Sequence, residues 1–232
     1  MHIDNFEQEI ENYLIYKSNK VKINSQEVKK DDVFIALQGS KTHGNNFIKD
    51  VQLKGAKYIV TDKRLPKNHD SNCLKVNDII SFLENLAKKK RNLFSGKIIA
   101  ITGSVGKTSS KELLKYFLSF TKSISASIKI YNNNLGILIS LLNMDLSSDY
   151  AIFEVGTNNY NEIKKLSSII LPNQIIITNI YPTHLKNFKN TRNIALEKSD
   201  LFNPKYNPNI ELAILPSSNK DEILLNDLAK KY

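Results

Sequence analysis

The amino-acid sequence predicts an α/β protein with two domains: a small α/β domain over residues 1–94 and a mostly parallel, P-loop-type domain over residues 95–232. Two observations favour this fold class. In the second half, apolar runs of strand length alternate with amphipathic segments of helix length, as a parallel sheet covered on both faces requires. In addition, a glycine-rich loop lies between the first of these strands and its helix, as in nucleotide-binding α/β domains.

The N-terminal half alternates short strand-like and helix-like segments. We expect a helix over residues 4–16, a second helix after Gly44, and a third that carries apolar residues at helical spacing, namely Ile79, Ile80, Leu83 and Leu86. Short apolar runs predict strands at 22–25, 33–37, 57–62 and 73–76. This half shows no obvious catalytic cluster, and Cys73 is interpreted as a small buried residue without a chemical role.

From residue 97 the chain repeats a unit of strand, loop and helix. The predicted strands are "KIIAIT" (97–102), "YAIFEV" (150–155), "QIIITNI" (174–180) and "ELAIL" (211–215), and the predicted helices cover 107–120, 161–170, 191–202 and 220–231. Gly96 precedes the first buried strand, so the domain boundary is set near "RNLFSG" (91–96). In open α/β folds, ligands bind at the carboxyl ends of such strands.

Composition and charge exclude several classes of protein. The 232 residues are 41% hydrophobic and 24% charged, which is ordinary for a globular protein. No stretch approaches the ~20 apolar residues that span a bilayer, and one cysteine excludes a disulfide framework. The net charge of +10 comes from scattered lysines, which argues against a nucleic-acid partner, although a positive field helps to attract nucleotides. We expect a cytoplasmic monomer without a membrane partner.

The segment "IAITGSVGKTSSKELL" (99–114) predicts a phosphate-binding loop. The common pattern G-x-x-x-x-G-K-[ST] fails at Ile101, but its flanks supply a buried strand before the loop and a helix after it. Unpaired N–H groups at the start of that helix favour an anion, Lys107 can neutralise β- and γ-phosphate charge, and the Thr108 hydroxyl can bind Mg²⁺. The predicted nucleotide contacts are Thr102, Gly103, Ser104, Val105, Gly106, Lys107, Thr108 and Ser109.

Two more polar residues follow predicted strands at the same edge of the sheet. Glu154 ends a buried strand, where a carboxylate needs a partner; Mg²⁺ and a salt bridge are nearly equal candidates. His184 follows the next strand, and a lone histidine is more often structural than a ligand. From these residues alone, both interpretations stay open.

In their order along the chain, these motifs resemble those of the Mur ligase family. The resemblance rests on "TGSVGKTSSKE" (102–112), "NNNLG" (132–136), "EVG" (154–156), "TNIYPTHLKNF" (178–188), and a lysine, Lys198, fourteen residues after His184. Ser104, the pair Lys111-Glu112 and "EVGTNNYNEI" (154–163) are more similar to the MurF branch than to the MurE branch. In the N-terminal half, residues 23–62 resemble the module that holds the UDP end of the substrate in both branches.

The resemblance implies an ATP-dependent ligase of peptidoglycan precursor synthesis, which joins D-alanyl-D-alanine to a UDP-N-acetylmuramoyl tripeptide through an acyl phosphate. It implies a UDP-substrate-binding domain followed by an ATP-binding central domain, with ATP and Mg²⁺ as cofactors. By this resemblance, the catalytic residues would be Lys107, Asn133, His184 and Lys198. The substrate contacts would be Ser25, Gln26 and Asn133. The Mg²⁺ ligands would be Thr108, Glu154, His184 and, if it is carbamylated, Lys198.

The chain also departs from the family pattern. The family's D-[ST]-R becomes Asn24-Ser25-Gln26, H-L-E becomes His184-Leu185-Lys186, the glycine of G-E-I becomes Asn161, and L-N-A-D-D becomes "LPSSN" (215–219). These changes leave open a non-catalytic nucleotide-binding relic, a MurE-type ligase, or an unrelated P-loop ATPase or kinase. Because full-length relatives continue into a further domain, the resemblance implies a C-terminally truncated copy that has an incomplete central domain and does not turn over alone.

Overall fold

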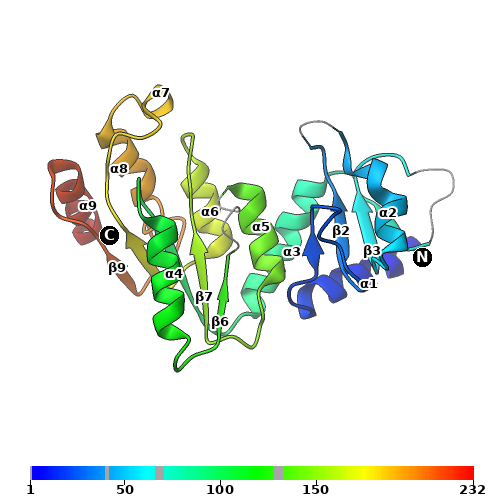
Figure 1. The fold of residues 1–232 in the computed structure, drawn as a ribbon. Coiled ribbons are helices and arrows are strands. Elements are labelled where there is room, and N and C mark those ends of the chain that lie inside the picture. The colour runs from blue at the N-terminus through cyan, green and yellow to red at the C-terminus, as the bar shows by residue number, and fades with distance from the viewer. Residues whose placement is uncertain (1, 40–41, 66–70, 128–132) are drawn as a thin grey trace. The chain divides into compact units, whose positions relative to one another are not determined.

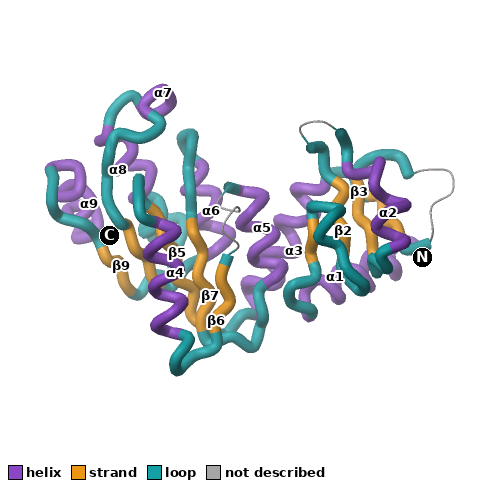
Figure 2. Tube along the Cα trace, in the orientation of Figure 1, coloured by secondary structure: helices purple, strands orange, loops and turns teal. Residues whose placement is uncertain are grey.

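The computed structural model describes residues 2–39, 42–65, 71–127 and 133–232. The chain divides into two compact units, Met1–Lys90 and Arg91–Tyr232. Each unit contains a sheet of parallel strands flanked by helices (Figures 1 and 2). The predicted α/β fold class is therefore confirmed. Helix α3 (Ile79–Leu93) runs across this division between the units, and the predicted domain boundary at 94/95 falls just after the helix ends.

The N-terminal unit has a four-stranded sheet in the order β1-β2-β3-β4. Its strands are β1 (Val21–Lys22), β2 (Val33–Ala36), β3 (Tyr58–Thr61) and β4 (Cys73–Lys75), and its helices are α1 (His2–Tyr16), the 3₁₀ helix η1 (Gly44–Phe47), α2 (Ile48–Leu53) and α3 (Ile79–Leu93). Every residue of β2 and β3 is buried. Strands buried on both faces need cover on both, which explains why their sequences are apolar without alternation.

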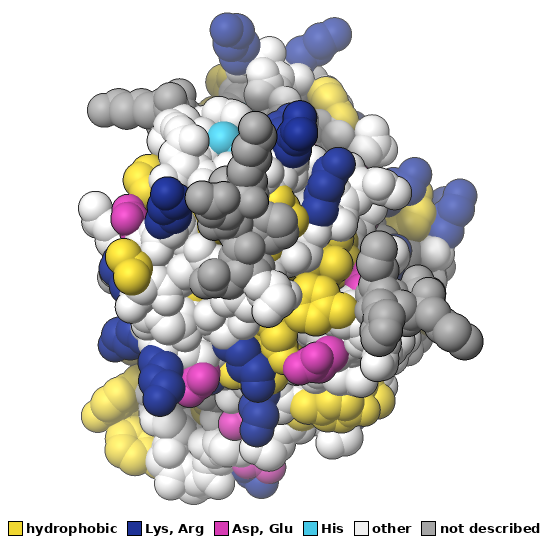
Figure 3. Space-filling view, turned by 90° about the vertical axis from the view of Figure 1, so that its right-hand side faces the viewer, with side chains coloured by type: hydrophobic (Ala, Val, Ile, Leu, Met, Phe, Trp, Pro, Cys, Tyr) yellow, Lys and Arg dark blue, Asp and Glu magenta, His cyan; other side chains and the backbone are white. Residues whose placement is uncertain are grey.

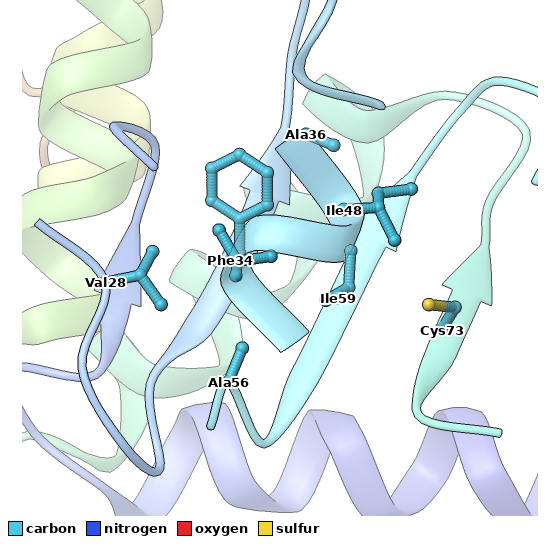
Figure 4. Packing of buried hydrophobic residues seen from close by; sticks show 8 residues of the cluster. Val28, Phe34, Ala36, Ile48, Ala56, Ile59 and Cys73 are labelled. Atoms are coloured by element: carbon cyan, nitrogen blue, oxygen red, sulfur yellow. The ribbon is translucent and has the colours of Figure 1, made fainter. Parts of the chain in front are cut away.

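A cluster of buried side chains joins the sheet to α2 (Figure 4). Phe34 of β2 and Ile59 of β3 are register partners, and Ile48 of α2 packs in the same cluster. Cys73 of β4 belongs to this cluster as well, so its prediction as a small buried residue is confirmed.

The predicted strand over 22–25 is wrong beyond Lys22, because β1 ends there. Asn24 Oδ1 accepts a hydrogen bond from Gln26 N at 3.0 Å, and Glu27 N donates to Asn24 O at 3.1 Å. An asparagine that bonds the backbone two residues ahead favours a turn over a strand. Ser25 and Gln26 therefore lie in a turn after β1.

The C-terminal unit has a five-stranded sheet in the order β6-β7-β5-β8-β9. Its strands are β5 (Lys97–Thr102), β6 (Ile124–Ala126), β7 (Tyr150–Glu154), β8 (Gln174–Ile177) and β9 (Leu212–Ile214). Its helices are α4 (Lys107–Leu118), α5 (Asn134–Asn143), α6 (Glu162–Ile170), α7 (Leu185–Phe188), α8 (Thr191–Ser199) and α9 (Lys220–Lys231). Strand β5 pairs with β7 on one side and β8 on the other, so the strand order reverses beside its carboxyl end. Ligands of open α/β sheets bind at such a reversal.

Several elements of this unit differ from the sequence prediction. Strand β6 and the helices α5 and α7 were not predicted, and α4, α8 and β8 end two or three residues before their predicted ends. The segment "NLGILISLLN" of α5 is almost uniformly apolar and so lacks the alternation of faces that identifies a surface helix. Strand β8 ends at Ile177. Thr178 N still donates to Thr102 O of β5 at 2.9 Å, while the side chains of Thr178 and Asn179 bond the glycine-rich loop.

The visible face in Figure 3 carries lysine and arginine side chains with hydrophobic and acidic side chains between them. This distribution matches the scattered lysines of the sequence. Elsewhere, the edge strand β9 leaves Leu212 and Ile214 about half exposed. Within the described ranges, no helix has the length and apolar character needed to cross a bilayer.

Candidate functional site

The glycine-rich loop leaves the carboxyl end of the central strand β5. Residues 98–101 of that strand are apolar and buried, and Thr102 at its end is fully buried as well. Gly103 and Gly106 have φ values of +147° and +84°, which L-residues with a side chain rarely adopt. Helix α4 begins directly after Gly106, which caps the helix without a side-chain hydrogen bond. The first N–H groups of α4 are therefore presented as an anion site.

The two glycines serve different purposes. A Cβ atom on Gly103 would lie 1.9 Å from Thr178 Oγ1, so this glycine lets the loop pass close to the chain after β8. At Gly106, apart from the glycine itself and its two chain neighbours, no atom of the described residues lies within 4 Å of the corresponding position. Gly106 therefore leaves open space beside the start of α4, where a phosphate can approach the backbone.

The residues after β8 hold the loop in this shape. Val105 N donates to Asn179 Oδ1 at 2.9 Å, Asn179 Nδ2 donates to Val105 O at 3.0 Å, and Thr178 Oγ1 donates to the same carbonyl at 2.6 Å. Ser104 N donates to Asn179 O at 3.1 Å. The chain after β8 thus holds the backbone of the loop at both Ser104 and Val105. In the sequence, "TN" (178–179) stands only as part of a family motif, and no local pattern predicts this structural role.

Lys107 lies over the loop. Its Nζ atom donates to Gly103 O at 2.9 Å and is 3.4 Å from Ser104 O. Burial lowers the pKa of Lys107, whereas nearby Glu154 acts in the opposite direction. A partly desolvated ammonium group is stabilised by a nearby phosphate, because the negative charge offsets the free-energy cost of removing water from the cation.

Thr108 and Glu154 form a pair beside the loop. Glu154 ends β7, next to Ile101 of β5, and is buried. Thr108 Oγ1 donates to Glu154 Oε2 at 2.8 Å. The carboxylate therefore has a hydrogen-bond partner, but Thr108 is neither of the two partners that the sequence predicted, a Mg²⁺ ion or a salt-bridging cation. A hydroxyl and a carboxylate at a phosphate-binding loop also suit Mg²⁺, which takes one or two protein oxygens and completes its shell with phosphate and water.

The metal role that the resemblance implies for His184 stays a prediction. His184 is exposed, has a φ of 52°, and caps α7 without a side-chain bond. Across the described parts of the chain, no three His, Cys, Asp or Glu side chains form a group that could hold a metal. Among the protein oxygens predicted as ligands, Thr108 and Glu154 come together, and a metal role of His184 rests on the resemblance alone.

Lys198 is buried rather than on the helix surface. It lies on α8 with 3% of its surface exposed, and its Nζ atom is 3.4 Å from Thr102 Oγ1 at the end of β5. Burial, together with the charge of Lys107, lowers the pKa of Lys198 from 10.5 to about 7, although Glu197 acts in the opposite direction. Lys198 is therefore not a solvent-facing lysine of α8, and its carbamylation stays a prediction.

We expect Lys198 to make the stability of the protein depend on pH. Its folded-state pKa of about 7 lies below the unfolded value of 10.5, so between these values the unfolded chain binds more protons. The free energy of unfolding therefore rises with pH across this window, by up to about 1.4 kcal/mol per pH unit. Lys198→Met should flatten the rise, whereas Lys115→Met, at an exposed site, should not. Urea unfolding at pH 7, 8 and 9 measures the slopes, and equal slopes for wild type and Lys198→Met would contradict this expectation.

Asn133 caps helix α5. Its Oδ1 atom accepts a hydrogen bond from Gly136 N at 2.9 Å, and the residue is exposed. Asparagine is among the best N-cap residues, which explains where α5 begins. A contact of Asn133 with substrate stays a prediction. The first asparagine of its motif, at position 132, lies outside the described residues.

The N-terminal unit has a pocket of about 290 Å³ beside the turn after β1. Ser25 and Gln26 line it, as do the apolar side chains of Phe34, Leu37 and Phe47. Gly44 also lines it, where a Cβ atom would lie 2.7 Å from Ala36 Cα. Polar groups beside an aromatic and aliphatic wall suit a flat, partly polar ring such as a nucleobase.

Comparisons with known proteins agree with this arrangement. Residues 101–232 match the Mur ligase middle domain, and residues 17–91 match the catalytic domain of the Mur ligase family. A UDP-N-acetylmuramoyl-tripeptide–D-alanyl-D-alanine ligase of Rickettsia prowazekii is 41% identical over 201 residues, covering 87% of this chain and 44% of that protein.

Two solved structures are also similar. MurF from Acinetobacter baumannii has a TM-score of 0.78 at 28% identity, over 91% of this chain and 46% of that one. MurF from Thermotoga maritima, in complex with ADP, has a TM-score of 0.77 at 25% identity, over 94% and 49%. The chain thus spans about half the length of the proteins it matches.

Proposed function

Because the chain belongs to the Mur ligase family, we propose that it serves the ATP-dependent addition of D-alanyl-D-alanine to a UDP-N-acetylmuramoyl tripeptide. The observation that carries this proposal is the Thr108–Glu154 pair at the start of α4, beside an organised glycine loop. The name of the Rickettsia relative supports the choice of substrates. The activity would contribute to peptidoglycan synthesis, and through it to cell shape and division.

The proposed chemistry requires two anions to meet. In a ligation through an acyl phosphate, the substrate carboxylate attacks the γ-phosphorus of ATP and ADP leaves. The incoming amine then attacks the acyl carbon, loses a proton and displaces inorganic phosphate. The N–H groups at the start of α4 would bind the phosphates, and Lys107 would leave its loop carbonyls to neutralise their charge. Mg²⁺, held by Thr108 and Glu154, would supply further neutralisation of the transferred phosphoryl group.

We include a carbamate on Lys198 in this proposal. A neutral amine adds to CO₂ and loses one proton, and a lysine whose pKa is about 7 is partly neutral near physiological pH. The product is an anion beside Lys107, whose charge would stabilise it, and an anion is a better neighbour for Mg²⁺ than an ammonium group. Labelling with ¹³C-bicarbonate tests for a carbamate carbon signal that is present in the wild type and lost in Lys198→Met.

The pocket of the N-terminal unit would hold the UDP end of the substrate. Gln26 stands where the family has arginine, so an amide would replace a guanidinium at this position. We expect Gln26→Ala to weaken binding of the UDP-muramyl tripeptide by roughly tenfold, the value of a hydrogen bond to a charged or polar ligand. The affinity of MgATP should not change. Titration calorimetry measures both, and Gln8→Ala, an exposed amide on α1 of the same unit and away from the pocket lining, is the control.

The same titrations test the function. Binding of both MgATP and UDP-N-acetylmuramoyl tripeptide supports the ligase proposal, and a mass assay for the D-alanyl-D-alanine product then tests turnover. Binding of ATP without the muramyl peptide would contradict the proposal and identify a nucleotide-binding relic or an unrelated ATPase. The proposal also includes a cytoplasmic location and a monomeric form, the latter tested by sedimentation.

A further inference from the structure

Lys111 is a buried cation that the proposed chemistry does not use. It lies on α4, three residues after Thr108 and so on the same side of the helix, and 1% of its surface is exposed. Its Nζ atom donates to Ser127 O at 2.7 Å and pairs with Glu112 Oε1 at 3.3 Å. A charge is buried so completely only where its bonds have a structural or functional use.

Ser127 connects Lys111 to the end of β7. Ser127 is buried; its N atom donates to Ile152 O at 2.9 Å, and its Oγ atom accepts from Glu154 N at 3.1 Å. The carbonyl of the same residue accepts from Lys111. Lys111 is therefore linked through one residue to the backbone of the carboxylate that pairs with Thr108.

We infer that Lys111 is a positioning residue for the Thr108–Glu154 pair. Helix α4 reaches the end of β7 at two points: Thr108 contacts the Glu154 carboxylate directly, and Lys111 holds the Glu154 backbone through Ser127. Two points of attachment fix the direction of the carboxylate as well as its distance from the hydroxyl. This inference rests on the proposed function, because it concerns the Mg²⁺ that this pair would hold.

Lys111 affects the binding of Mg²⁺ through the geometry of the Thr108–Glu154 pair rather than through its charge alone. If the ammonium group acted mainly through space, it would repel Mg²⁺, and its removal would strengthen metal binding. The ion pair with Glu112 offsets much of that charge. Partners outside the ligand shell that orient metal ligands typically contribute 10- to 100-fold in metal affinity. We therefore expect the loss of Lys111 to reduce the gain in nucleotide affinity that Mg²⁺ provides.

The experiment compares the affinity of a non-hydrolysable ATP analogue with and without Mg²⁺. Lys111→Met, which removes the ammonium group and keeps most of the length of the side chain, should lower the ratio of the two affinities by about tenfold or more, as expected for such an orienting partner. The affinity in EDTA should stay near that of the wild type, because the loop and Lys107 remain. Lys115→Met, the same change one turn further at an exposed position of α4, should leave both values unchanged.

Ser127→Ala is the second variant. It removes the hydrogen bond from Glu154 N to Ser127 Oγ and leaves Lys111 in place. Ser127→Ala should also lower the ratio of the affinities measured with and without Mg²⁺, and it tests the inference if Lys111→Met does not fold. Equal loss of affinity with and without Mg²⁺ would show a purely structural role and overturn the inference, as would a ratio that neither variant changes. A wild-type chain that binds the analogue without any Mg²⁺ dependence would refute the proposed function together with the inference.

Discussion

Lys107→Ala is expected to abolish the binding of MgATP, with a loss of affinity of about 100-fold or more. Charge-assisted hydrogen bonds to phosphate are among the strongest polar contacts in proteins, and alanine removes both the charge and the donors. In the wild type, the ammonium group lies at the loop, 2.9 Å from Gly103 O, and it would exchange this carbonyl for the charge of a phosphate. Titration calorimetry with MgATP measures the change.

The control for this prediction is Lys115→Ala, which removes an exposed lysine from the same helix. It lowers the net charge by the same amount, so it reports any contribution of the general positive field to nucleotide affinity. Unchanged affinity of Lys107→Ala, or equal losses in the two variants, would refute the assignment of the loop as a nucleotide site.

Gly103→Ala is expected to destabilise the C-terminal unit by about 3 kcal/mol or more. The new Cβ atom would lie 1.9 Å from Thr178 Oγ1, and alanine would have to adopt a φ of +147°. Either the loop or the chain after β8 must move, which also breaks the bonds to Val105 described above. Costs of about 1–3 kcal/mol apply both to such strain and to overpacking, and here they act together. Urea unfolding measures the loss.

Gly106→Ala is the matched comparison, since this glycine also has a positive φ, of +84°, but has open space where its Cβ would lie. It should cost about 1–2 kcal/mol, the strain of a left-handed alanine alone. The difference between the two variants thus measures the close approach of the loop to Thr178. If both lose the same stability, the packing of Gly103 against Thr178 is not what holds the loop.

The sequence predicted the site best where local chemistry decides it. The buried run before Gly103, the two glycines and Lys107 predict a phosphate loop whatever surrounds them, because strand, turn and helix start are local structures. Glu154 was predicted to have a partner for an equally local reason: a carboxylate in a buried strand must be compensated. The structure supplies that partner as Thr108, 46 residues earlier in the chain.

Prediction failed where the surroundings decide the structure. Strand β6 has three residues and needs β7 beside it, so its own sequence does not identify it. The pattern of the preceding apolar residues predicted a strand at Ser25. The hydrogen bond from Gln26 N to Asn24 Oδ1 outweighs that pattern and makes the segment a turn. The exposed position of His184 and the burial of Lys198 were equally outside the reach of periodicity.

By itself, then, the sequence determined the α/β class, the parallel arrangement of the second domain, the loop that faces a phosphate and the family to which the chain belongs. Those properties depend on apolar periodicity, on the conformations that glycine allows and on the order of short motifs, and each of these can be recognised from residues close together in the sequence. Only the tertiary structure decided that Thr108 meets Glu154, that Lys198 is buried beside Thr102, and that Lys111 reaches Glu154 through Ser127. These contacts join segments 16 to 96 residues apart, and they exist only once the sheet has placed α4, β7 and α8 together.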